Sequence, residues 1–171
     1  MTDISKNENK MYDTLLYLIS TDQLDNRNKI LCTAARNGYL EVVKLIIDAG
    51  ADVNVDNIKY ITVYGDIYKH NYTPLTRAAI NGHLAVVQYL VDHGAKVNLE
   101  YSDALDVIRN GHFDIIKYLV AQGSTDFDKK DYAAAEAAIK GHLEIFFYLL
   151  DKGADISPYK TFIFREMVKN A

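Results

Sequence analysis

The chain has 171 residues, of which 49% are hydrophobic and 25% charged, a balance that suits one folded domain and excludes a long disordered tract. The formal net charge of -4 lacks the excess of lysine and arginine that phosphate neutralisation requires, so nucleic acid is not an expected partner. No stretch approaches the roughly 18 uninterrupted apolar residues of a membrane span, and the single cysteine, Cys32, excludes an internal disulfide; we expect an intracellular, cytoplasmic protein that binds no membrane.

The first expected element is a helix within residues 11–27. Its apolar residues Leu15, Leu16, Leu18 and Ile19 follow nearly the same spacing as those of helices later in the chain. Because each unit of a repeat array contacts only its neighbours, the open end of such an array needs a cover. We interpret residues 11–27 as a half-repeat that caps the N-terminal side.

Four pairs of glycines organise most of the remaining chain. The first glycine of each pair precedes an aromatic ring and the second lies 12 residues later; the pairs are Gly38 and Gly50, Gly82 and Gly94, Gly111 and Gly123, and Gly141 and Gly153. Apolar residues between the two glycines fall on one wide helical face, and another short helix precedes each first glycine. The pattern predicts four helix pairs: repeat 1 over 28–54, repeat 2 over 73–98, repeat 3 over 99–127 and repeat 4 over 128–156.

Residues 55–72, between repeats 1 and 2, contain two β-prone runs on either side of Gly65-Asp66. Glycine at the first position of a two-residue loop is typical of a type II′ turn, so we predict an extended β-hairpin finger with Tyr64 opposite Ile67 and Val63 opposite Tyr68. Both faces of the ribbon carry aromatic and apolar residues. The finger either projects and offers Tyr60, Tyr64 and Tyr68 as interface anchors, or folds back over repeat 2.

A last helix is expected within residues 157–171. Ser157-Pro158 is a typical helix start, and Phe162 and Ile163 are suited to pack on repeat 4. Met167 and Val168 stand where repeat 4 has small residues, as expected of a helix that ends the array. We interpret this segment as the C-terminal cap.

The segment Thr73-Pro74-Leu75-Thr76-Arg77-Ala78-Ala79-Ile80-Asn81-Gly82-His83 closely resembles the signature of the ankyrin-repeat family, with Thr76 where the family usually has histidine. The resemblance covers about residues 28–171 and implies an all-α solenoid of helix pairs that binds another protein without catalysis or cofactor. The first glycines are spaced by 44, 29 and 30 residues, against about 33 in the family. The shorter spacings are similar to those in ankyrin arrays of large DNA viruses.

The resemblance also implies which residues contact the partner. In ankyrin proteins, the position just before the small residues of each first helix lines the concave groove. That position is occupied here by Thr33, Arg77, Asp106 and Glu136, which we call the groove row. The groove row and the three finger tyrosines are the predicted partner-binding residues.

Neither a metal site nor a catalytic nucleophile is expected. His83, His112 and His142 occupy one position in successive repeats, so they form a row spaced by about 10 Å, too wide for one zinc ion, and are interpreted as structural. No serine, threonine or cysteine stands in a recognisable nucleophile motif. We therefore expect a monomer that is not an enzyme and holds no metal; the alternative is a scaffold or self-assembling subunit that pairs through the edge of its hairpin.

Overall fold

The computed structural model describes residues 24–55, 57–63, 66–97, 99–123 and 130–169; for 24–26, 57–63 and 66–71 it describes the backbone alone. The N-terminal cap expected within residues 11–27 lies largely outside these ranges. In the described ranges the chain is mostly helical, and its elements follow the order α2 (Leu24–Asn37), α3 (Leu40–Asp48), β1 (Asn57–Val63), β2 (Asp66–Tyr72), α4 (Pro74–Ile80), α5 (Leu84–Asp92), α6 (Tyr101–Arg109), α7 (Phe113–Ala121), α8 (Lys130–Ile139), α9 (Leu143–Asp151), a 3-10 turn (Ser157–Tyr159) and α10 (Lys160–Lys169).

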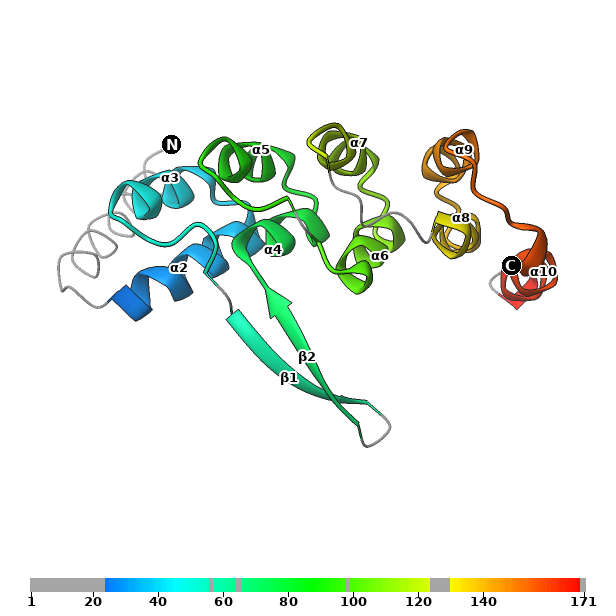
Figure 1. Ribbon diagram of the computed structural model, residues 1–171, viewed down its shortest axis with the longest axis horizontal. Coiled ribbons are helices and arrows are strands. Elements are labelled where there is room, and N and C mark those ends of the chain that lie inside the picture. The colour runs from blue at the N-terminus through cyan, green and yellow to red at the C-terminus, as the bar shows by residue number, and fades with distance from the viewer. Residues whose placement is uncertain (1–23, 56, 64–65, 98, 124–129, 170–171) are drawn as a thin grey trace, which may run out of the picture.

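The helices stack as two rows that run the length of the molecule (Figure 1). One row contains the first helix of each repeat, α2, α4, α6 and α8, and each packs against the next. The other contains the second helices, in which α3 contacts α5 and α5 contacts α7. The described part of the chain is therefore a solenoid of helix pairs, as the sequence predicts.

Local signals fix where these helices begin and end. Thr73 caps α4 because its side-chain oxygen accepts a hydrogen bond from the Thr76 amide at 3.1 Å, and Pro74 occupies the first turn, where its missing amide proton costs nothing. Gly94 follows α5 with a φ of +88°, and the next amide, of Ala95, donates to the Leu90 carbonyl at 2.9 Å. This is the Schellman arrangement that closes a helix C-terminus.

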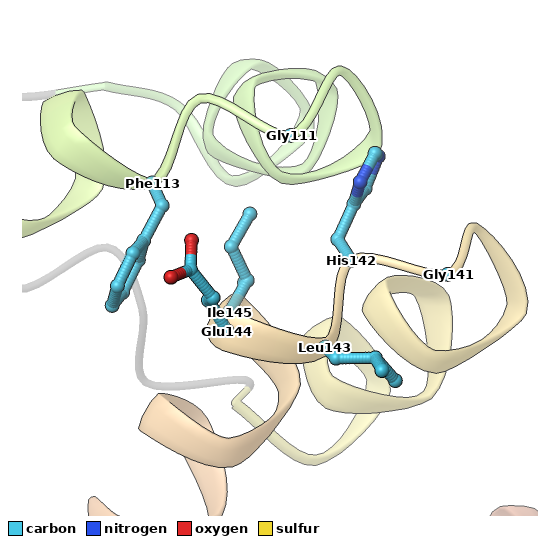
Figure 2. A pocket seen from close by; sticks show the side chains of 7 residues that line it. All are labelled: Gly111, Phe113, Gly141, His142, Leu143, Glu144 and Ile145. Carbon is cyan, nitrogen blue, oxygen red and sulfur yellow. The ribbon is translucent and has the colours of Figure 1, made fainter.

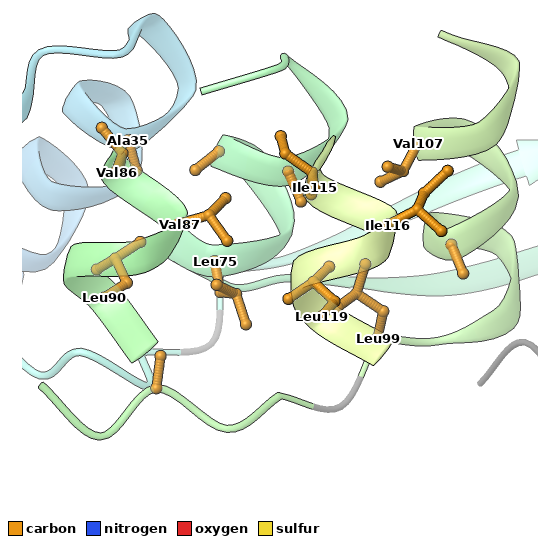
Figure 3. Close-up of a cluster of buried hydrophobic side chains, with 14 of the residues drawn as sticks. Ala35, Leu75, Val86, Val87, Leu90, Leu99, Val107, Ile115, Ile116 and Leu119 are labelled. Atoms are coloured by element: carbon orange, nitrogen blue, oxygen red, sulfur yellow. The ribbon is translucent and has the colours of Figure 1, made fainter. Parts of the chain in front are cut away.

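The core lies between the two helix rows and continues from repeat to repeat. Leu75, Val87, Leu90, Ile116 and Leu119 are at most 1% exposed and interdigitate across repeats 2 and 3 (Figure 3). Cys32 on α2 is also buried. Since each repeat buries its apolar face on its neighbours, the stability of the array depends on the contacts between repeats.

The histidines predicted to be structural join successive repeats. The Nε2 atoms of His83, His112 and His142 lie 2.9, 3.1 and 2.8 Å from the carbonyl oxygens of Arg36, Ile80 and Arg109, respectively, each in the preceding repeat. Each ring also lies against the first glycine of that repeat, where a Cβ atom would approach it to 2.5–2.6 Å. The first glycines therefore make room for these rings.

The segment between α3 and α4 forms two antiparallel strands that extend from the row of first helices (Figure 1). The predicted register is wrong: Val63 pairs with Asp66 and Thr62 with Ile67, so residues 64–65, not Gly65-Asp66, connect the strands. The two registers differ by two residues on one strand and place the same residues on each face, so the alternation of side chains cannot distinguish them. The side chains of residues 57–63 and 66–71 lie outside the described part of the structure, so the distribution of the finger tyrosines between the two faces of the hairpin stays a prediction.

Two helix boundaries bear on the predicted organisation. Helix α2 begins at Leu24, so the expected division between a cap (11–27) and repeat 1 (28–54) falls within this helix. Residues 24–28 contain no glycine or proline that would interrupt a helix there. The expected final helix is present as α10, preceded by the 3-10 turn at Ser157–Tyr159, and it packs against α8. The other repeat boundaries stay predictions.

Candidate functional site

The groove row lies on four neighbouring helices, one residue each on α2, α4, α6 and α8, but its members have different surroundings. Thr33 is exposed, and its hydroxyl donates to the Lys29 carbonyl of its own helix at 2.9 Å. Arg77 is half-buried, with its guanidinium carbon 5.0 Å from the centre of the Tyr72 ring. Asp106 is partly exposed, whereas Glu136 is only 7% exposed.

Arg109 connects the two acidic members of the groove row. It lies one turn after Asp106 on α6, and its Nη1 is 3.3 Å from the Asp106 carboxylate. Its Nε is 3.1 Å from the Glu136 carboxylate on α8, which also accepts a hydrogen bond of 2.6 Å from the Tyr132 hydroxyl. Arg109 and Tyr132 were not among the predicted site residues, although their spacings of i, i+3 to Asp106 and i, i+4 to Glu136 place them on the same helix faces.

This cluster fixes the charge of its members. Burial by itself raises the pKa of Glu136, but hydrogen bonds from Arg109 and Tyr132 together with the positive charge of Arg109 outweigh it, so the pKa lies below its usual value. The hydrogen bond to Glu136 is the main cause that raises the pKa of Arg109. The pKa of Tyr132 is raised by the same carboxylate and by burial. Glu136 is therefore an ionised carboxylate that holds repeats 3 and 4 together.

The lowered pKa of Glu136 predicts a pH dependence of stability. A carboxyl group with a lower pKa in the folded state stabilises the fold above its unfolded pKa, near 4.5, and loses this contribution as pH falls through the folded value. The free energy of unfolding of the natural chain should therefore exceed that of Glu136→Gln at pH 7, and the difference should shrink below pH 4.5. Urea denaturation at a series of pH values measures it. A difference that does not change between pH 7 and pH 3 would contradict the lowered pKa.

The base of the hairpin joins the groove row. Tyr72 ends β2, one residue before the cap of α4, and its half-buried ring lies under Arg77. Burial, followed by the charges of Asp103 and Asp106, raises the pKa of Tyr72. Among the predicted finger residues, Tyr60 and Tyr68 lie on β1 and β2, and Tyr64 lies outside the described residues. The end of β2 thus contacts α4, and we call the first helices and the hairpin, namely α2, α4, α6, α8, β1 and β2, the first-helix face.

A separate recess of about 310 Å³ lies between repeats 3 and 4 at the start of the second helices (Figure 2). It is lined by Gly111, Phe113, Gly141, His142, Leu143, Glu144 and Ile145. Its only ionisable side chains are those of His142 and Glu144. Over the described ranges, no group of three or more histidine, cysteine or acidic side chains is placed to hold a metal ion. None of the described helices is long and apolar enough to span a membrane.

Comparison with known proteins agrees with the repeat architecture. A family model described as ankyrin repeats in three copies matches residues 4–101 and 106–159, which include both strands, the helices α2 to α5 and α7 to α9, and the two ends of α6. No curated protein matches the chain significantly.

Proposed function

Because the chain belongs to the ankyrin-repeat family, we propose that it binds another protein through its first-helix face. Ankyrin repeats are generally protein–protein interaction modules and typically not enzymes. One such scaffold serves unrelated targets, because specificity depends on the side chains that the repeats present. The proposal therefore rests on the residues of this face.

The observation that carries the proposal is the contact between Tyr72 and Arg77. The guanidinium of Arg77 lies 5.0 Å from the centre of the Tyr72 ring, so a residue of the hairpin and a residue of the groove row meet. A partner that contacts the groove row therefore also meets the base of the finger. Tyrosine and arginine are the side chains most often found at the energetic centre of interfaces, alongside tryptophan.

Some residues of the groove row would contact the partner, and Glu136 would support them. Thr33, Arg77 and Asp106 retain exposed surface for the partner, whereas the carboxylate of Glu136 is occupied by Arg109 and Tyr132. Glu136 would therefore act by holding Arg109 in place. The finger tyrosines Tyr60, Tyr64 and Tyr68 would add aromatic anchors. The described members carry both signs of charge, which favours a partner surface of mixed charge.

We also propose that the protein acts in the cytoplasm. The chain has one cysteine, and that side chain is buried in the core of repeat 1. A fold that uses no disulfide suits a reducing environment. We place the interaction in the cytoplasm, which fractionation of cells that express the tagged chain would test.

Affinity capture followed by hydrogen exchange tests the proposed function. The tagged full chain would be used to isolate partners, which mass spectrometry identifies, and each complex would then be compared with the free chain for amide exchange. We expect slower exchange on binding in the first helices and in the strands. The variant Gln88→Ala, on the exposed side of α5, serves as the matched control and should bind normally. Protection confined to α3, α5, α7 and α9 would contradict the proposal.

A further inference from the structure

Exposed apolar side chains gather at the C-terminal end of the solenoid. In the described ranges six large apolar side chains are exposed, and five of them lie on the last two helices. These are Leu143 and Phe147 on α9, and Phe164, Met167 and Val168 on α10. Their exposed fractions run from 49% to 72%. Several large apolar side chains exposed at one end of a folded protein commonly mark an interaction site.

Helix α9 differs from the other second helices in the residues that it exposes. Phe147 occupies the position that is polar in the three preceding repeats, where Lys44, Gln88 and Lys117 stand. The residue before it, Phe146, is only partly buried, whereas its equivalents Val43, Val87 and Ile116 are fully buried. Helix α9 thus has the apolar residue Phe147 where the other second helices have a polar one, and its core residue Phe146 is not fully buried.

The last layer of the solenoid contains one helix where every earlier layer contains two. Helix α10 packs against α8, in the row of first helices, and among the described residues no second helix follows it. Among the described residues, no helix occupies the place beside α9 that a second helix of this layer would fill. Gly141 agrees with this: its φ of +76° is similar to that of Gly111, which lies against the His142 ring, yet no atom of the described residues lies within 4 Å of a Cβ built at Gly141.

We propose that this end is a dimer interface, in which α10 of a second copy of the chain fills the open place beside α9. A two-fold axis across the last layer would bring the two α10 helices together as one shared pair, with α8 and α9 of each copy on either side. Such an interface is isologous, so the contact between α9 and the partner copy's α10 occurs twice. Leu143 and Phe164, both exposed in a single copy, would then be covered together; at the position of Leu143 in the preceding repeat, Phe113 packs edge-on against Tyr148 of the next second helix.

Charge favours a second copy as the occupant. Helix α9 carries Glu144 and Asp151 and no basic residue, whereas α10 carries Lys160, Arg165 and Lys169 against the single acidic residue Glu166. The proposed arrangement sets the acidic helix of each copy beside the basic helix of the other, and the pairing of Arg165 and Lys169 with Glu166 within α10 limits the repulsion between the two neighbouring α10 helices. One end of the chain therefore supplies both the apolar surface and the charges that complement it.

Analytical ultracentrifugation of the full chain over a range of concentrations tests the proposal. We expect a concentration-dependent dimer whose dissociation constant rises by about thirtyfold or more in Phe164→Asp and in Leu143→Asp, as at interface hot spots. Leu143 is 59% exposed in a single copy, so the fold of the second variant should persist in circular dichroism. Tyr39→Asp, at the opposite end of the array and 53% exposed in the natural chain, is the matched control and should dimerise normally.

Charge reversal on separate copies gives a sharper test. The variant Glu144→Lys with Asp151→Lys and the variant Lys160→Glu with Arg165→Glu should each remain monomeric, because like charges then face each other in both contacts. Mixed in equal amounts, they should form a one-to-one dimer in which both contacts join opposite charges. A natural chain that stays monomeric, a dimer unchanged by Leu143→Asp, a dimer lost when the hairpin is shortened, or charge variants that fail to combine would each overturn the proposal.

Discussion

Arg109→Ala should lower the free energy of unfolding by about 2 kcal/mol. The change removes the cation that bridges Asp106 on α6 and Glu136 on α8, and it leaves the Glu136 carboxylate buried with the Tyr132 hydroxyl as its remaining side-chain partner in the cluster. Removing one member of a fully buried pair costs roughly 3–5 kcal/mol. We expect a smaller loss because the Arg109 side chain is 37% exposed. Urea denaturation followed by circular dichroism measures the change.

Lys44→Ala provides the comparison for Arg109→Ala. Lys44 pairs with Glu41 at 2.7 Å on α3, but both side chains are well exposed, and such surface pairs contribute roughly 0–1 kcal/mol. Lys44 and Arg109 are similarly exposed, at 38% and 37%, so the two substitutions differ in the burial of the carboxylate partner, 64% exposed in Glu41 and 10% in Glu136, and in whether the contact joins two repeats. Equal losses of stability would show that the Arg109 cluster does not hold repeats 3 and 4 together.

Gly111→Ala should cost roughly 2–3 kcal/mol, clearly more than Gly141→Ala. Both glycines have a positive φ, of +79° and +76°, so alanine introduces a similar backbone strain of roughly 1–2 kcal/mol at either site. At Gly111 the new Cβ would also lie 2.6 Å from the His142 ring. The ring must then move and lose its hydrogen bond to the Arg109 carbonyl, a further loss of about 1 kcal/mol.

Thermal or urea unfolding of both glycine variants, at concentrations where the chain is monomeric, makes this comparison. A second variant, His142→Ala combined with Gly111→Ala, separates strain from the clash, because the alanine at 111 then meets no ring. The added cost of the alanine should fall to that of Gly141→Ala in this background. If Gly111→Ala and Gly141→Ala have the same stability in the natural background, the histidine contacts do not depend on the glycines.

The helices could be predicted from sequence because their signals are local. The glycines before and after α5, with apolar residues between them at helical spacing, predict a helix that the structure places at Leu84–Asp92. The register of the hairpin could not be predicted in the same way. Pairing Val63 with Asp66 or with Tyr68 leaves the same residues on each face, so the sequence pattern is satisfied by both.

The contacts of the candidate site depend on partners from different repeats, which repeat alignment does not reveal. Arg109 stands where the other repeats have Arg36, Ile80 and Ile139, so its position gives no recurring signal. Aligning the repeats placed Glu136 in the same row as the exposed Thr33. The structure shows that Arg109 and Tyr132 enclose it, because both side chains reach it across the contact of α6 with α8.

Changes in the finger can separate an effect on partner binding from an effect on folding. Its strands lie outside the stacked helix pairs, so replacing residues 59–71 by a short turn should leave the melting temperature nearly unchanged. Tyr68→Ala retains the ribbon and removes one predicted anchor. A hot-spot side chain contributes roughly 2 kcal/mol or more to binding, which corresponds to a loss of affinity of about thirtyfold.

The measurement that tests the central claim is therefore the affinity of the captured partner for the natural chain, the shortened chain and Tyr68→Ala, recorded together with their melting temperatures. Recognition through the first-helix face predicts at least about thirtyfold weaker binding in both variants, with little change in melting temperature. Unchanged affinity with a large drop in melting temperature would contradict it, since the finger would then belong to the folded core.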